Sequence, residues 1–149
     1  MNALTHHHAF ASSAALAALR ADIAARRKAR AVNLAIHARQ HGSALLAVAR
    51  FRLDRSAQTA LSRLVAAGCA EDRWMPATTR DLRAVVRGLG VAIARRAEGA
   101  VTDALAWHLD RLREICAQDA RIAALEAVLE AHWPEGLKAL RPRGAKAKR

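Results

Sequence analysis

The side chains most able to do chemistry in this sequence are basic, and they are concentrated at one end. Residues 1–53 hold eight Arg or Lys residues and one acid, Asp22. Like charges repel one another in a compact fold, so this distribution favours a polyanionic partner, either nucleic acid or an acidic protein. We expect phosphate contacts with little base readout, to duplex DNA or structured RNA. The candidate nucleic-acid-binding residues are Arg20, Arg26, Arg27, Lys28, Arg30, Arg39, Arg50, Arg52, Arg143, Lys146, Lys148 and Arg149.

Two of these arginines conflict with the expected helix. At 100° per residue, Arg27 and Arg30 fall on the apolar face that starts at Leu16. Either their stems extend outward from the edge of that face, or they form a patch that faces phosphate. If they pair with carboxylates of the same chain instead, their charge is used inside the fold and the nucleic-acid interpretation weakens. The carboxylates in question are those of Glu114, Asp119 and Glu126.

His37 and His41 are four residues apart and share one helix face, which is a spacing used by metal ligands. A zinc-protease helix also needs Glu directly after the first His, and position 38 is Ala. We therefore expect semi-buried or surface histidines rather than a metal centre. The sequence contains no Walker loop, GxSxG motif or Glu-x-x-His pair. We expect a non-enzymatic protein without a cofactor.

Residues 79–97 resemble a helix-turn-helix motif. Leu89-Gly90-Val91 is similar to the turn of that motif, in which Gly allows a sharp bend between two helices. The sequence departs from the pattern at Arg96, where the motif has a buried apolar residue. The resemblance implies a turn at Gly90.

The elements that must position these residues are helices. Ala and Arg are good helix formers, and alternating strand patterns are missing. We expect an all-α fold, an antiparallel bundle of about four helices with a flexible basic C-terminal tail. Residues 1–11 are expected to be frayed, 12–141 to form one helical domain, and 142–149 to be disordered. The predicted helices run from Ser12 or Ser13 to Gly42, from Ala44 to Ala67, and over about 79–133. The last is one long helix or a kinked helix pair, with Thr78 or Thr79 as its cap, a kink or break near Gly88–Gly90, and a stop at Pro134.

A second interpretation assigns the chain to a different class. The apolar stripe over 82–133 has mixed charges beside it, as in a helix that pairs with a partner. The protein would then be a structural or adaptor subunit of a larger assembly, with a homo-oligomer formed through that stripe. Codon usage in a GC-rich genome explains the Arg excess as well as binding does. A basic amphipathic helix lying on a membrane surface ranks behind both interpretations.

The sequence also bears on location. The longest apolar runs are shorter than the ~18 residues of a membrane span, and no secretory signal is recognisable. Cys69 and Cys116 form no CxxC pair. We expect a cytoplasmic protein. The alternative is the mitochondrial matrix, if the Arg- and Ala-rich residues 1–31 are a presequence.

Overall fold

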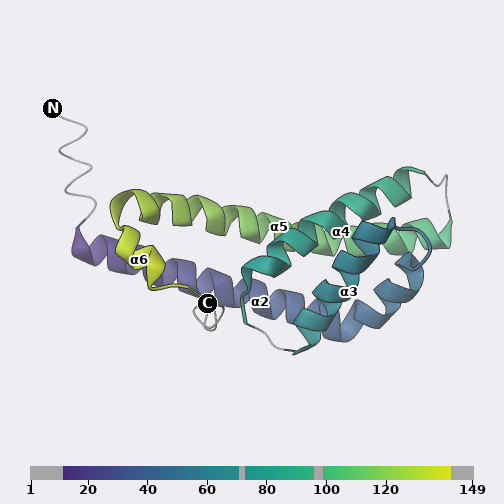
Figure 1. The fold of residues 1–149 in the computed structure, drawn as a ribbon, viewed down its shortest axis with the longest axis horizontal. Coiled ribbons are helices and arrows are strands. Elements are labelled where there is room, and N and C mark those ends of the chain that lie inside the picture. Colours follow the sequence, from purple (N-terminus) through teal and green to yellow (C-terminus); the bar gives the residue numbers. More distant parts are fainter. Residues whose placement is uncertain (1–11, 71–72, 96–98, 142–149) are drawn as a thin grey trace. The chain divides into compact units, whose positions relative to one another are not determined.

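The structure, a computed structural model, describes residues 12–70, 73–95 and 99–141, which form helices and no strand. The helices are α2 (Ser13–Ala49), α3 (Arg55–Ala70), α4 (Pro76–Ala94), α5 (Ala100–His132) and α6 (Pro134–Lys138), as labelled in Figure 1. The expected all-α bundle is therefore confirmed. The chain divides into two compact units, residues 28–119 and residues 1–27 with 120–149. The single domain expected over 12–141 stays a prediction.

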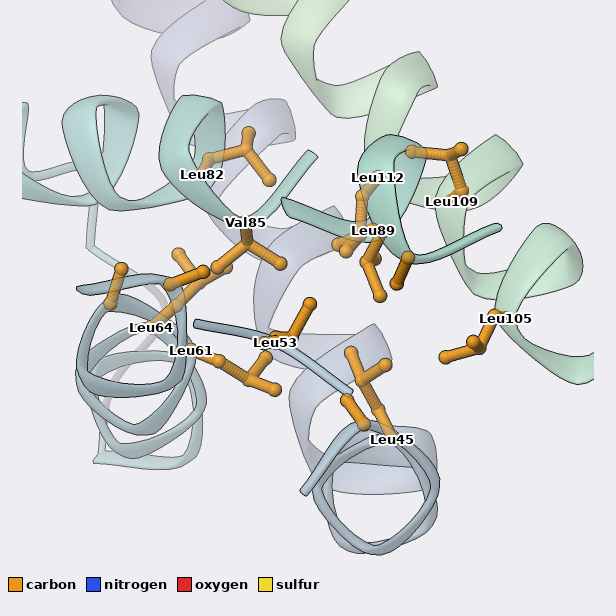
Figure 2. Close-up of a cluster of buried hydrophobic side chains, with 14 of the residues drawn as sticks. Leu45, Leu53, Leu61, Leu64, Leu82, Val85, Leu89, Leu105, Leu109 and Leu112 are labelled. Carbon is orange, nitrogen blue, oxygen red and sulfur yellow. The ribbon is translucent and has the colours of Figure 1, made fainter. Parts of the chain in front are cut away.

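The unit formed by residues 28–119 has one apolar core to which α2, α3, α4 and α5 all contribute. Figure 2 shows these side chains converging from the four helices. Leu82, Val85 and Leu89 of α4 are fully buried there, as is Leu105 of α5. The apolar stripe expected to join two copies of the chain is thus buried, over 82–115, inside this unit itself.

Close helix contacts in the same unit explain two of its glycines, Gly42 and Gly68. A Cβ atom on Gly42 would lie 2.7 Å from Val65 Cγ1, and one on Gly68 would lie 2.6 Å from the Ala38 Cβ. Any larger side chain would force α2 and α3 apart. The predicted helix ends at Gly42 and Ala67 are wrong. α2 continues through Gly42 to Ala49, and α3 includes Gly68, because these glycines serve packing rather than helix termination.

The turn between α2 and α3 lies at residues 50–54 instead of at Ser43. The Arg52 N–H donates a hydrogen bond to the Ala49 carbonyl at 2.9 Å, which ends α2. Asp54 Oδ1 then accepts a hydrogen bond from the Ala57 N–H at 2.8 Å. This is the geometry of an N-cap aspartate, so Asp54 sets where α3 begins.

α4 starts at Pro76, whose missing N–H costs nothing in the first helical turn. Thr78, a predicted cap, instead lies inside that turn, where its hydroxyl donates to the Met75 carbonyl at 2.6 Å. The helix passes Gly90 without a break, so the helix-turn-helix prediction is wrong. The predicted region 79–133 does contain two helices, but α4 ends at Ala94 and α5 begins at Ala100. Gly99, directly before α5, has a positive φ of 132°.

The second unit, in its described residues 12–27 and 120–141, has its own small core. Ile23 of α2 is buried with Ile122 and Leu129 of α5, and Trp133 packs against them. Ser12 Oγ accepts from the Ala15 N–H at 3.3 Å, as expected of an N-cap. α5 ends at His132, before Pro134, as the sequence predicted.

The predictions of a frayed segment at 1–11 and a disordered tail at 142–149 concern residues outside the described part of the chain. Among those that are described, no helix is long and apolar enough to cross a membrane.

Candidate nucleic-acid interface

The N-terminal arginines of α2 in residues 12–27 contact other parts of their own unit. Arg26 Nε lies 3.1 Å from Asp22 Oδ1, in an exposed pair one helical turn apart. Arg27 is half-buried and donates both to the Glu126 carboxylate and to the Leu140 carbonyl. The guanidinium of Arg20 lies over the Trp133 ring, 5.9 Å from its centroid. The Arg27 charge is therefore used within the fold, through the pairing with Glu126 that the sequence offered as an alternative to a phosphate-facing patch.

Arg30 is the largest fully buried side chain among the described residues of the unit 28–119, at 1% exposure. Its Nη2 donates to Asp119 Oδ2 at 2.9 Å, and its Nη1 donates to Thr78 Oγ1 at 2.7 Å. Its Nε also lies 2.8 Å from Asp119 Oδ1, a charge contact that lacks good hydrogen-bond angles. Arg30 neither extends out of the core nor faces phosphate, because its charge is neutralised where α2, α4 and α5 meet.

The other predicted residues of this unit remain at the surface. Lys28, Arg39 and Arg50 are exposed. Arg52 is half-buried and donates from Nη1 to the Val48 carbonyl at 2.6 Å. Arg50 lies 5.0 Å from the centroid of the Phe51 ring, which is itself 81% exposed. The tail residues Arg143, Lys146, Lys148 and Arg149 lie outside the described part of the chain.

The structure adds a row of cations that sequence reasoning missed. Arg80, Arg83 and Arg87 lie on the solvent face of α4, and Arg95 directly follows the helix. Successive helical residues are 100° apart, so Arg80, Arg83 and Arg87 span a sector of about 60°. These four residues are referred to as the α4 arginine face. Within the described residues, none of the four is ion-paired with a carboxylate.

The α4 arginine face has no acid of its own helix beside it. Asp81, which provides the one carboxylate of α4, is 8% exposed. Arg63 of α3 holds it, with Nη2 2.9 Å from Oδ1. The spacing of 80, 83 and 87 by three and four was visible in the sequence. A regional sum of charge does not reveal this row, because the acids near α4 offset the arginines.

A second cluster of polar groups gathers between α2 and α5 in the same unit. The His37 and His41 rings have centroids 5.3 Å apart, and His108 Nδ1 lies 3.5 Å from His37 Nε2. The Trp107 ring lies 4.8 Å from His41 and 6.0 Å from His37, centroid to centroid. The sequence predicted the first pair and gave no sign of His108. In the described residues, no three His, Cys, Asp or Glu side chains are placed to hold a metal ion together.

Burial favours the neutral forms of His37 and His108. Loss of hydration, followed by the nearby His108, His41 and Arg111, lowers the pKa of His37 from 6.5 to about 4. Burial and then His41 lower the pKa of His108 as well. The cluster opens into a groove of about 390 Å³, which Ile36 and Trp107 also line. Both are large apolar side chains, exposed at 47% and 42%.

Comparison with known proteins adds no assignment: no protein-family model matches the chain, and neither a curated protein nor a solved structure is detectably similar to it.

Proposed function

We propose that the protein is a non-enzymatic, basic helical protein that binds nucleic acid through the α4 arginine face. The observation that carries this proposal is the row of exposed arginines at Arg80, Arg83 and Arg87, continued by Arg95. The one carboxylate of the helix, Asp81, is paired with Arg63 of α3 instead. An unpaired row of this kind holds positive charge at the surface, where only salt screens it.

The dimensions of the row suit a phosphate backbone. Fifteen residues separate Arg80 from Arg95, about 22 Å at 1.5 Å per residue. Duplex DNA carries one charge per ~1.7 Å of its axis, so several phosphates lie within that length. The guanidinium group has a planar fork of donors that matches phosphate oxygens. Contacts at each of the four positions would make binding strong at low salt and weak at high salt.

Little base readout is expected from this face. α4 contains no Asn, Gln or aromatic residue, so the side chains that pair with adenine or stack on unpaired bases are missing from it. Phosphate contacts fix the position of a protein on a duplex but carry no sequence information directly. Duplex DNA and structured RNA should therefore bind with similar affinity and little sequence preference.

Charge reversal tests the proposal. Fluorescence anisotropy at ~50 mM salt would compare the wild type with Arg80→Glu/Arg83→Glu/Arg87→Glu, on a random duplex DNA and on a structured RNA. We expect micromolar binding by the wild type and its loss in the variant, because repulsion replaces three phosphate contacts.

The matched control is Lys28→Glu/Arg39→Glu/Arg113→Glu, which changes the same amount of charge at exposed residues of α2 and α5. We expect it to retain most of the binding. Equal losses in the two variants would show that net charge, rather than the α4 arginine face, carries the affinity. Absence of binding by the wild type at this salt concentration would overturn the proposal. Circular dichroism of each variant confirms that it is folded.

The structural or adaptor role is a second candidate, and two observations favour it. Arg27 and Arg30 are paired internally, which weakens the part of the nucleic-acid argument that concerns the start of α2. Ile36 and Trp107 also expose apolar surface along one groove, as protein-binding surfaces do. If this groove binds a protein, Ile36→Asp should release a co-purified partner, whereas Val128→Asp, at a similarly exposed position, should retain it.

A further inference from the structure

A small polar pocket lies beside the α4 arginine face, within the unit 28–119. It has a volume of about 210 Å³ and is lined by residues of the 50–54 turn, the start of α3 and the face of α4. The lining groups that matter are Arg52, Asp54, Ser56, Arg87 and Arg95. Ala57 and Gly88 also line it, at a point where a Cβ on Gly88 would lie 2.7 Å from the Ala57 Cβ. α3 and α4 thus approach closely beside the pocket.

The charge of the pocket is strongly positive. Three guanidinium groups line it, against the single carboxylate of Asp54. One oxygen of that carboxylate, Oδ1, already accepts the hydrogen bond that caps α3. The capped helix adds to the positive potential, since the N-terminal N–H groups of α3 carry partial positive charge. An anion is the ligand that these groups favour.

The Arg52 side chain is held in place beside the pocket. Its Nη1 is held by the Val48 carbonyl at 2.6 Å, which fixes the position of the side chain. Its Nε is buried and has no acceptor among the described protein atoms. The fixed Arg52 side chain is one of the three arginines that give the pocket its positive charge.

We propose that this pocket, formed by Arg52, Arg87, Arg95 and Ser56, binds one phosphate group. Its volume suits a phosphate rather than a whole nucleotide, since small-molecule sites usually enclose ~300 Å³ or more. Arg87 belongs both to the pocket and to the α4 arginine face, so a phosphate held here would lie in line with the backbone contacts made by Arg80 and Arg83. The inference rests on the proposed function in one respect: it identifies the bound group as a phosphate of the nucleic-acid backbone.

The test uses the full-length protein, with inorganic phosphate as the probe. Isothermal titration at constant ionic strength, balanced with chloride, would compare the wild type with Arg87→Gln/Arg95→Gln. We expect saturable binding of phosphate and a weakening of at least tenfold in the variant. The matched control, Arg80→Gln/Arg83→Gln, removes the same amount of charge from the α4 arginine face outside the pocket, and it should bind phosphate like the wild type.

Parallel titrations with a short duplex DNA and with a structured RNA separate this inference from the proposed function. Nucleic-acid binding without saturable phosphate binding, or phosphate binding weakened equally in both variants, would overturn the pocket and leave the α4 arginine face standing. Saturable, pocket-dependent phosphate binding with no affinity for DNA or RNA would support the pocket as a site for free phosphate or phosphate monoesters, and would overturn the proposed function. Absence of binding to either probe would overturn both.

Discussion

Acid should destabilise this protein through His37. Its pKa is about 4 in the folded chain and 6.5 for an ordinary histidine, so the unfolded chain binds the proton more readily. The stabilising effect of keeping His37 neutral is fully present above pH 6.5 and is lost as the pH falls from 6.5 to about 4. A pKa fall of about 2.5, at 1.36 kcal/mol for each pKa unit, gives a loss of about 3 kcal/mol.

The loss of stability in acid depends on several neighbouring side chains and not on the His37 ring alone. His41 and His108 face His37 together with Arg111, and each of these charges opposes its protonation. The pKa of His108 is lowered in the same direction, so its protonation adds to the effect. Arg111 and Glu114, 3.0 Å apart, border the same groove. Acid should therefore loosen the packing of α2 against α5 first.

Urea unfolding followed by circular dichroism, at half-unit steps between pH 4 and pH 7.5, measures this effect. Wild-type stability should fall steeply below pH 6.5, and His37→Gln should show a shallower slope over the same range because its side chain does not titrate. Both proteins contain the same carboxylates, so the contribution of these groups to the pH dependence of stability cancels in the comparison. Parallel curves for the two proteins would refute the reasoning that burial holds His37 neutral.

The remaining stability predictions use the same urea assay at pH 7. Asp119→Leu should cost about 3–5 kcal/mol, because it leaves the Arg30 charge buried without its carboxylate. Arg30→Met combined with Asp119→Leu should recover much of that loss, and a double variant as unstable as the single one would contradict the ion-pair explanation. Gly88→Ala should destabilise by about 1–3 kcal/mol, since its Cβ would meet Ala57, whereas Gly90→Ala, which meets nothing within 4 Å, should stabilise by about 0.5–1 kcal/mol. Equal effects at the two glycines would exclude the close α3–α4 contact. Asp54→Ala should cost about 1 kcal/mol through loss of the α3 cap, and an unchanged midpoint would show that the cap contributes nothing.

The fold class and some helix ends followed from the sequence, because local chemistry decides them. Pro134 has no backbone N–H to donate, so it ends α5 whatever packs against that helix. Ser12 caps the N-terminus of α2 through a contact within the first turn. Gly42 and Gly68 were misassigned because glycine has two uses that look alike in sequence. It can end a helix, or it can let two helices approach, and only the partner helix decides which.

The candidate site was harder to predict because charge pairing over long sequence separations is invisible in a charge count. Arg30 and Asp119 are 89 residues apart, and Arg27 and Glu126 are 99 apart. The regional charge count therefore included both arginines among the candidate phosphate contacts, although their positions on the apolar face left pairing with Asp119 or Glu126 open. It also missed Arg87 and Arg95, which the fold brings to one pocket with Arg52. His108 likewise joins His37 only through the packing of α5 against α2.

The salt dependence of nucleic-acid binding tests the central claim most directly. The association constant of the wild type and of Arg80→Gln/Arg83→Gln/Arg87→Gln for one duplex DNA would be measured from ~50 to 200 mM salt. Each neutralised phosphate contributes about −0.9 to the slope of log K against log salt concentration. The account predicts that removing three contacts makes the slope shallower by about 3. Equal slopes for the two proteins would show that the α4 arginine face does not contact phosphate, and would contradict the account.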